Sequence, residues 1–243
     1  IEAAIGPATA GVYYLAGAQS RPHLREVVAA AHAQGVPVLV DAAAQLPPAE
    51  NLRRFIDEGA DLVCFSGGKA LGGPQASGIL AGRGDLVASA LLQMLDLDVY
   101  DDLWAPPAEF AALGQLRGLP HHGIGRSCKL GKEEIAGLCV ALRRFVAEDP
   151  TARQGRWLAV LEGLREAAGL DGLRLEAGPI PHLALDCGSE QAAVTLARRL
   201  AAGVPSIACA PGRRERGVLG FSPVALTIEE ARIVGARLKE LAG

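Results

Sequence analysis

Short apolar runs alternate with amphipathic segments along the first third of the chain, and this alternation limits the folds open to it. Three runs have the length and composition of strands: 12–16, 36–40 and 62–65. The segments between them, 22–35 and 51–59, carry apolar residues at helical spacing and end at glycines. Strands that alternate with helices in this way are typical of a mostly parallel sheet. We therefore expect an α/β fold, with an antiparallel strand at 77–81 after a tight Gly-Gly-Pro turn.

Two polar side chains follow neighbouring strands of this predicted sheet. Asp41 ends the second strand, and Lys69 follows the third in the turn Ser66-Gly67-Gly68-Lys69. In open α/β sheets, ligands bind beyond the carboxyl ends of the strands. A surface loop is the usual explanation of a Gly-Gly-Lys turn, but Asp41 one strand earlier favours a cofactor site. Pyridoxal phosphate uses such a pair, because a lysine binds its aldehyde carbon and a carboxylate keeps its pyridine nitrogen protonated.

Composition and charge narrow the classes of partner. The net charge of −3 and the scattered basic residues argue against a nucleic-acid partner and favour a small-molecule substrate. Charged residues interrupt every apolar run, which argues against a membrane span. The cysteines are widely spaced, without a Cys-x-x-Cys pair or a His/Cys cluster, and we expect buried reduced thiols, no metal site and a cytoplasmic protein.

The rest of the chain predicts a second, smaller part. We expect a large domain at 1–130, a connecting helix at 131–150 and a small α+β domain at 151–243, with one of its strands near Ile207. The stretch 85–119 has helical signals with a break at Pro106-Pro107, and we expect it to form a cleft wall. We interpret His182, which lies in an apolar strand, as a core histidine with its hydrogen bonds satisfied rather than as a ligand. The basic run at 213–216 favours a solvated hairpin tip over a phosphate contact.

Three segments carry a resemblance to a known family. VDAAAQLPP at 40–48 and FSGGKALGGPQ at 65–75 resemble the fold-type-I pyridoxal-phosphate enzymes, nearest to the selenocysteine-synthase-like group. That group includes L-seryl-tRNA(Sec) selenium transferase and D-glucosaminate-6-phosphate ammonia-lyase. GIGRSCKLGKEEI at 123–135 is similar to the lyase branch, with Ser127-Cys128 where that branch has Pro-Met. The resemblance implies a large domain with a mostly parallel sheet and a small C-terminal domain.

The resemblance also implies roles for individual residues near the cofactor. Lys69 would be the lysine bound to pyridoxal 5'-phosphate, and Asp41 the partner of the pyridine nitrogen. The Ser66 hydroxyl would contact the cofactor phosphate, and Gln45 could reach the ring oxygen. Gln75 would lie near the cofactor phosphate, either of this subunit or of a neighbouring one.

On the substrate side, the resemblance implies that Arg126 binds a carboxylate or phosphate, since a guanidinium fork suits these anions. An ion pair of Arg126 with Glu133 or Glu134 at a helix start is the alternative. His122, next to His121, could act as acid or base, and a solvent-facing loop pair is the competing interpretation.

The function that follows is a lyase that eliminates a β-hydroxyl and ammonia from a hydroxylated amino acid or a phosphorylated amino-sugar acid. Lys69 would remove the Cα proton, and we expect apolar walls to bury it so that it can be neutral. Two alternatives stay open: selenium transfer to a seryl group on tRNA, and a catalytically silent remnant. The family implies a homo-oligomer. The chain begins at Ile1 without the family's N-terminal phosphate-binding turn, so we expect it to be the later part of a longer polypeptide.

Overall fold

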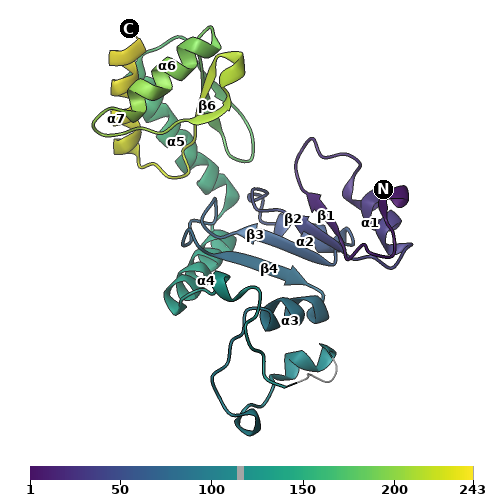
Figure 1. Ribbon diagram of the computed structural model, residues 1–243. Helices are drawn as coiled ribbons and strands as arrows, with labels where there is room; N and C mark the ends of the chain where they lie inside the picture. Colours follow the sequence, from purple (N-terminus) through teal and green to yellow (C-terminus); the bar gives the residue numbers. More distant parts are fainter. Residues whose placement is uncertain (114–117, 243) are drawn as a thin grey trace. The chain divides into compact units, whose positions relative to one another are not determined.

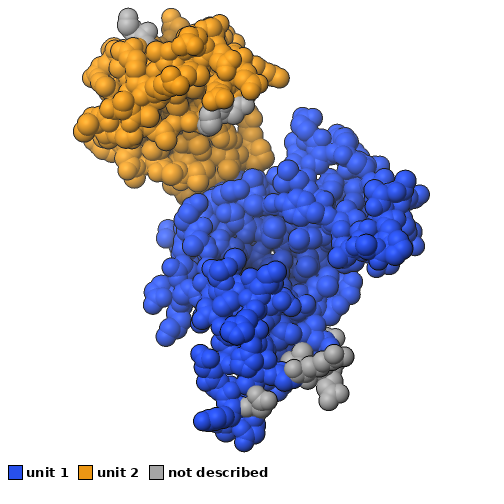
Figure 2. Space-filling view, viewed as in Figure 1, with its two compact units in different colours: residues 1–146 blue, residues 147–243 orange. Residues whose placement is uncertain are grey.

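The computed structural model describes residues 1–113 and 118–242. Contacts between Cα atoms divide the chain into two compact units, Ile1–Val146 and Ala147–Gly243 (blue and orange in Figure 2). Each unit contains one four-stranded sheet with its own helices. The α/β fold expected from the sequence is confirmed.

The sheet of the first unit has the strand order β1-β2-β3-β4 (Figure 1). Its strands are β1 (Val12–Leu15), β2 (Val38–Asp41), β3 (Leu62–Ser66) and β4 (Gly78–Gly82). The first three strands are parallel, and β4 pairs antiparallel with β3, as the short Gly-Gly-Pro connection predicts. Parallel strands have their carboxyl ends at one edge, so the ends of β2 and β3 are neighbours.

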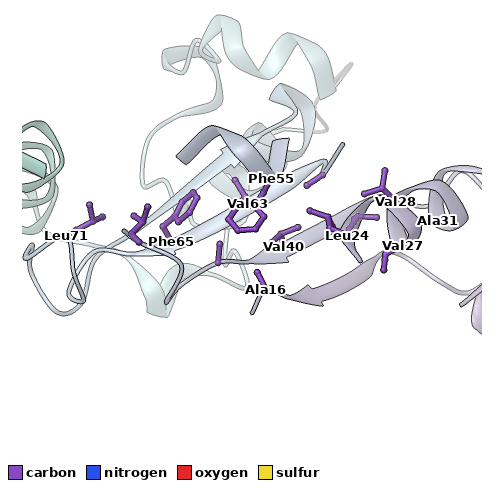
Figure 3. Close-up of a cluster of buried hydrophobic side chains, with 14 of the residues drawn as sticks. Ala16, Leu24, Val27, Val28, Ala31, Val40, Phe55, Val63, Phe65 and Leu71 are labelled. Atoms are coloured by element: carbon purple, nitrogen blue, oxygen red, sulfur yellow. The ribbon is translucent and has the colours of Figure 1, made fainter. Parts of the chain in front are cut away.

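One face of this sheet is buried under two helices, α1 (Leu24–His32) and α2 (Asn51–Asp57). Successive right-handed crossovers that advance in one direction place both helices on the same face. Figure 3 shows Val40, Val63 and Phe65 of the sheet in one cluster with Leu24 of α1 and Phe55 of α2. Burial of each large apolar side chain stabilises the fold by about 1.5–3 kcal/mol. The alternate residues of each strand therefore lie on the opposite face.

That opposite face is open in the part of the chain that the structure describes. Tyr13 and Leu15 of β1 are 62% and 64% exposed, and Leu80 of β4 is also exposed. Leu15 pairs with Asp41 in the β1–β2 register, and Asp41 pairs with Cys64 of β3. Paired residues share a face, so Asp41 lies on the open side of the sheet.

The remaining helices of the first unit are α3 (Gly84–Leu92) and α4 (Lys132–Ala147). Short 3-10 turns lie at Glu2–Ala4, Asp101–Leu103, Ala108–Leu113 and Arg126–Cys128. The predicted helical character of 85–119 is thus realised as one helix and two short turns, with 114–117 outside the described residues. Leu138 and Phe145 of α4 belong to the same buried cluster as the sheet.

The second unit has an antiparallel sheet of order β5-β6-β8-β7. Its strands are β5 (Leu173–Glu176), β6 (His182–Asp186), β7 (Ala210–Arg213) and β8 (Val218–Phe221), and its helices are α5 (Pro150–Ala168), α6 (Glu190–Ala201) and α7 (Ile228–Ala242). Side chains cap α5 and α6, where Asp149 and Ser189 accept hydrogen bonds from the N–H groups of Ala152 and Ala192.

Two expectations for this unit and for the cysteines are wrong. The strand expected near Ile207 begins at Ala210, because the Ile207 N–H bonds to the Leu200 carbonyl at the end of α6. Burial was expected of all the cysteines, but Cys128 and Cys139 are exposed, since they lie in a short turn and on the outer side of α4. All five thiols are free.

Each helix that the structure describes is too short or too polar to cross a bilayer.

Candidate functional site

The Asp41 carboxylate is fixed at the end of β2 by two donors. The Tyr13 hydroxyl donates to Oδ2 at 2.5 Å, and the Ala43 N–H donates to Oδ1 at 2.9 Å. These hydrogen bonds, first from Tyr13 and then from Ala43, hold the pKa of Asp41 below its ordinary value despite partial burial. Asp41 is therefore an ionised, oriented acceptor on the open side of the sheet.

The loop that carries Lys69 is a closely packed turn. The Gly67 N–H donates to the Ser77 carbonyl, the Gly73 N–H donates to the Gly67 carbonyl, and the Gly72 N–H donates to the Lys69 carbonyl, each at 2.9 Å. A Cβ atom on Gly68 would lie 2.6 Å from the Gln75 Cα, so no larger residue fits there without movement. The glycines are required by this close approach of two chain segments.

The Lys69 side chain itself is exposed. The expectation that apolar walls bury it is wrong for the described residues, because the sheet face beside it is uncovered. Lys69 lies close enough to Asp41 for its positive charge to add to the lowering of the Asp41 pKa, behind the contributions of Tyr13 and Ala43. The two side chains that the sequence singled out thus belong to one place at the carboxyl edge of β2 and β3.

The three further residues predicted to hold the cofactor lie around this edge. Ser66 ends β3 and is partly exposed, and no described residue hydrogen-bonds its hydroxyl. Gln45 donates through Nε2 to the Ala16 carbonyl at 2.9 Å, which ties the loop after β2 to the end of β1. Gln75 is exposed and packs against Gly68 inside the Lys69 turn. Their contacts with a cofactor stay predictions.

Arg126 and His122 are held together by a carboxylate that the sequence did not indicate. Asp96 accepts a hydrogen bond from the His122 N–H at 3.1 Å, and its Oδ2 lies 3.9 Å from Arg126 Nε. The alternative, in which Arg126 pairs with Glu133 or Glu134, is therefore wrong, because the carboxylate that Arg126 pairs with is that of Asp96. His122 is almost fully exposed and has a φ of 51°, a left-handed conformation that costs about 1–2 kcal/mol for a residue other than glycine.

Arg126 is 44% exposed, and neither it nor His122 contacts Lys69 through any interaction of the described residues. Their substrate-side roles therefore stay predictions. In the second unit, His182 donates through Nδ1 to the Ile180 carbonyl at 2.8 Å, as expected of a satisfied histidine. Arg213 forms a two-bond ion pair with Glu176 at 2.7 and 2.8 Å beside the β7–β8 hairpin.

Sequence reasoning missed Tyr13 and Asp96. Tyr13 lies in β1, and its partner is set by the register of β1 and β2, in which Leu15 pairs with Asp41. A polar group in an otherwise apolar strand, two residues before the strand end, was the available signal. Asp96 lies in an irregular stretch after α3 that has no periodic pattern, so nothing in the sequence marks its partner.

The residues present fit pyridoxal phosphate. An ionised carboxylate suits a protonated pyridine nitrogen, an exposed lysine amine beside it can reach an aldehyde, and a hydroxyl at Ser66 suits a phosphate. Within residues 1–113 and 118–242, no cluster of His, Cys, Asp and Glu is suited to a metal ion.

Comparisons with known proteins find relatives over nearly the whole chain. The family model for L-seryl-tRNA selenium transferase matches residues 8–98. The chain is 32% identical to a 5'-C-glycyluridine monooxygenase-decarboxylase of a Streptomyces species, over 99% of this chain and 56% of the relative. It is 27% identical to the D-glucosaminate-6-phosphate ammonia lyase of Salmonella typhimurium (strain 14028s / SGSC 2262), over 100% of this chain and 60% of the relative.

Solved structures show the same fold. A structure of D-glucosaminate-6-phosphate ammonia-lyase superposes with a TM-score of 0.63 at 25% identity, over 99% of this chain and 59% of that one. The ureidoglycine-glyoxylate aminotransferase of Bacillus subtilis superposes with a TM-score of 0.54 at 16% identity, over 96% of this chain and 60% of that one. The chain thus spans a little more than half the length of these relatives, which are pyridoxal-phosphate enzymes.

Proposed function

We propose that this chain, which has the fold of the fold-type-I pyridoxal-phosphate enzymes and relatives in their selenocysteine-synthase-like group, forms part of an ammonia-lyase. The substrate would be a hydroxylated amino acid or a phosphorylated amino-sugar acid, and the products ammonia and a 2-oxo acid. One observation carries the proposal: at the carboxyl edge of β2 and β3, Lys69 lies close enough to Asp41 for its charge to act on the Asp41 carboxylate.

Three side chains would hold pyridoxal 5'-phosphate: Asp41 at the pyridine nitrogen, Lys69 at the aldehyde carbon and Ser66 at the phosphate. When bound, the cofactor supplies an electron sink that stabilises negative charge at the substrate Cα. Gln45 and Gln75 are the further candidates at its ring oxygen and phosphate. A carboxylate fixed by two hydrogen bonds keeps its orientation without cost when the cofactor arrives.

The chain's own residues would then act on the substrate. The Lys69 amine, once displaced from the cofactor, would take the proton from the substrate Cα and pass it to the departing β-hydroxyl, which would leave as water. Hydrolysis of the resulting enamine would then take up one water and release ammonia and the 2-oxo acid. Arg126 would bind a carboxylate or phosphate of the substrate, with Asp96 orienting its guanidinium. His122, held by the same Asp96, would face the substrate as acid or base.

A second candidate is oxidative decarboxylation, which the similarity to the monooxygenase-decarboxylase over 99% of this chain favours. Both reactions begin with bond cleavage at the substrate Cα, so the residues around Lys69 do not separate them. The two reactions differ in the bond that breaks at the substrate Cα. A lyase removes the Cα proton, whereas a decarboxylase removes the carboxyl group. Release of carbon dioxide with uptake of oxygen identifies the second reaction, and release of ammonia without either identifies the first.

Selenium transfer to seryl-tRNA is the third possibility, and the family model that matches residues 8–98 is its support. The net charge of −3 argues against it, because a tRNA partner calls for a basic surface. Retention of tRNA that weakens with added salt would favour the transferase.

The test is an assay of the protein with pyridoxal phosphate and a panel of β-hydroxy amino acids and phosphorylated amino-sugar acids. Ammonia and a 2-oxo acid in equal amounts, lost in Lys69→Ala, support the lyase. No product from any substrate, together with no binding of the cofactor, would favour a catalytically silent remnant. The same preparation reports its assembly, since we expect a homo-oligomer by light scattering.

A further inference from the structure

Tyr13 of β1 reaches the Asp41 carboxylate on the neighbouring strand β2. Its hydroxyl lies 2.5 Å from Asp41 Oδ2, although Tyr13 is paired with Leu39 in the register of β1 and β2. Asp41 is two residues beyond Leu39, so the contact is a diagonal one between side chains on one face of the sheet. Tyr14, the next residue, lies on the other face and contacts the Pro22 carbonyl at 3.4 Å.

We propose that Tyr13 is a positioning residue for the cofactor site: its hydroxyl fixes the Asp41 carboxylate in one orientation. This inference rests on the proposed function, because it assigns Tyr13 a purpose at the carboxylate that would bind the pyridine nitrogen. No described contact gives the Tyr13 ring a role in the core, since the side chain is 62% exposed.

The geometry leaves room for the cofactor. An ionised carboxylate has about four lone-pair positions on its two oxygens. In Asp41, Tyr13 uses one position on Oδ2 and the Ala43 N–H uses one on Oδ1. Each oxygen thus retains an acceptor position, and a pyridine N–H can bond to Asp41 without displacing Tyr13.

The charges around Asp41 agree with this assignment. The Tyr13 hydrogen bond is the largest cause that lowers the pKa of Asp41, and the same bond raises the pKa of the Tyr13 hydroxyl. The other groups that face the pair are Cys64 of β3 and Lys69 of the following turn. The Cys64 thiol has a raised pKa from burial and from Asp41, so it stays neutral and does not compete with Tyr13 as an anion.

The decisive experiment uses the protein without cofactor. The pKa of the Asp41 carboxyl is measured by carbon-13 NMR in wild type, in Tyr13→Phe and in the matched control Tyr14→Phe. We expect the Asp41 pKa to rise toward its ordinary value in Tyr13→Phe and to stay unchanged in Tyr14→Phe. An unchanged Asp41 pKa in Tyr13→Phe, or an equal rise in both variants, would overturn the proposal.

A reciprocal measurement covers the case in which Tyr13→Phe folds poorly. In Asp41→Asn, the raised pKa of the Tyr13 hydroxyl should fall toward its ordinary value. A Tyr13 pKa that Asp41→Asn does not lower would contradict the contact.

Cofactor binding is a separate arm. With pyridoxal phosphate, Tyr13→Phe should bind several-fold more weakly than wild type, and should have no added effect in the Asp41→Asn background. Additive losses in the double variant would overturn the positioning role. Failure of the wild type to bind pyridoxal phosphate would overturn the proposed function and with it the cofactor role of Tyr13. The measurements without cofactor separate that outcome from a failure of the Tyr13–Asp41 contact itself.

Discussion

The Asp41 carboxylate and the Lys69 amine lie within range of each other's charge, at the ends of neighbouring strands. Hydrogen bonds from Tyr13 and from the Ala43 N–H lower the pKa of Asp41 most, and the Lys69 charge lowers it further. Both residues are reached from the open side of the sheet, where Tyr13 and Leu15 are exposed. An acid and an amine in this arrangement are what a pyridoxal site requires.

Asp41→Asn should weaken pyridoxal phosphate binding by more than about tenfold, since removal of one partner of a hydrogen-bonded charge pair costs about 2–5 kcal/mol. Asp57→Asn is the control, because it removes the same charge from an exposed position at the end of α2. Equilibrium titration with the cofactor measures both. Equal affinities of Asp41→Asn and wild type would remove Asp41 from the site.

The close packing of the Lys69 turn around its glycines leads to a second prediction, which concerns stability and cofactor binding. Gly68→Ala places a Cβ atom 2.6 Å from the Gln75 Cα, so the turn must open. We expect a loss of stability of about 1–3 kcal/mol and weaker cofactor binding. Gly84→Ala, at the exposed first residue of α3 with nothing within 4 Å of the added atom, should leave both unchanged. Chemical denaturation gives the stability, and a Gly68→Ala variant as stable as wild type would contradict the packing described.

We expect a buried carboxylate away from the site, Asp61, to contribute to the pH dependence of the stability of the first unit. Asp61 accepts hydrogen bonds from the Val38 N–H at 2.7 Å and from Arg83 at 3.1 Å, and lies 2.8 Å from His32. Burial alone would raise its pKa, but the His32, Val38 and Arg83 contacts outweigh it, and the pKa is lowered.

Because the folded pKa of Asp61 is depressed, its contribution to stability is present above the ordinary Asp value of about 3.9 and is lost as the pH falls through the folded value. Asp61→Asn should therefore destabilise the protein by about 1–3 kcal/mol at neutral pH and flatten the loss of stability in acid. Thermal unfolding from neutral to acid pH measures this. A variant that keeps the acid slope of the wild type would show that other groups cause it.

Much of this site follows from the sequence because strand ends are local features. The apolar runs before Asp41 and Lys69 determine both strands, and the parallel order brings their ends together. The proximity of Asp41 and Lys69 could be predicted without further information. The exposure of Lys69 could not be predicted in the same way, because it depends on what covers the sheet face.

Contacts that depend on strand register or on irregular loops could not be predicted from the sequence. Tyr13 meets Asp41 only because β1 and β2 pair with Leu15 beside Asp41. Arg126 meets Asp96 rather than Glu133 because the backbone after α3 turns back on the segment around Gly123. The strand expected near Ile207 starts three residues later, where pairing with Gly220 of β8 begins.

Two helical glycines of the second unit, Gly155 and Gly235, differ in how closely the neighbouring helix packs against them. Their replacement by alanine therefore tests helix packing and helix propensity separately. Gly235 of α7 faces α5, and a Cβ atom there would collide with the Leu164 carbonyl and lie 2.8 Å from the Ala167 Cβ. Gly155 of α5 has nothing within 4 Å of the added atom. Gly155→Ala should stabilise the protein by up to about 1 kcal/mol, and Gly235→Ala should destabilise it despite the same gain in propensity. Chemical denaturation compares the two, and a stabilising Gly235→Ala would contradict the α5–α7 contact.

The central claim is that Lys69 binds the cofactor. Its most direct test is reduction of the protein with borohydride in the presence of pyridoxal phosphate, followed by mass spectrometry of the peptides. We predict one pyridoxyl group on Lys69 and its loss in Lys69→Arg, with Lys129, Lys132 and Lys239 unmodified. A pyridoxyl group on another lysine in place of Lys69, or cofactor bound with Lys69 unmodified, would contradict the account.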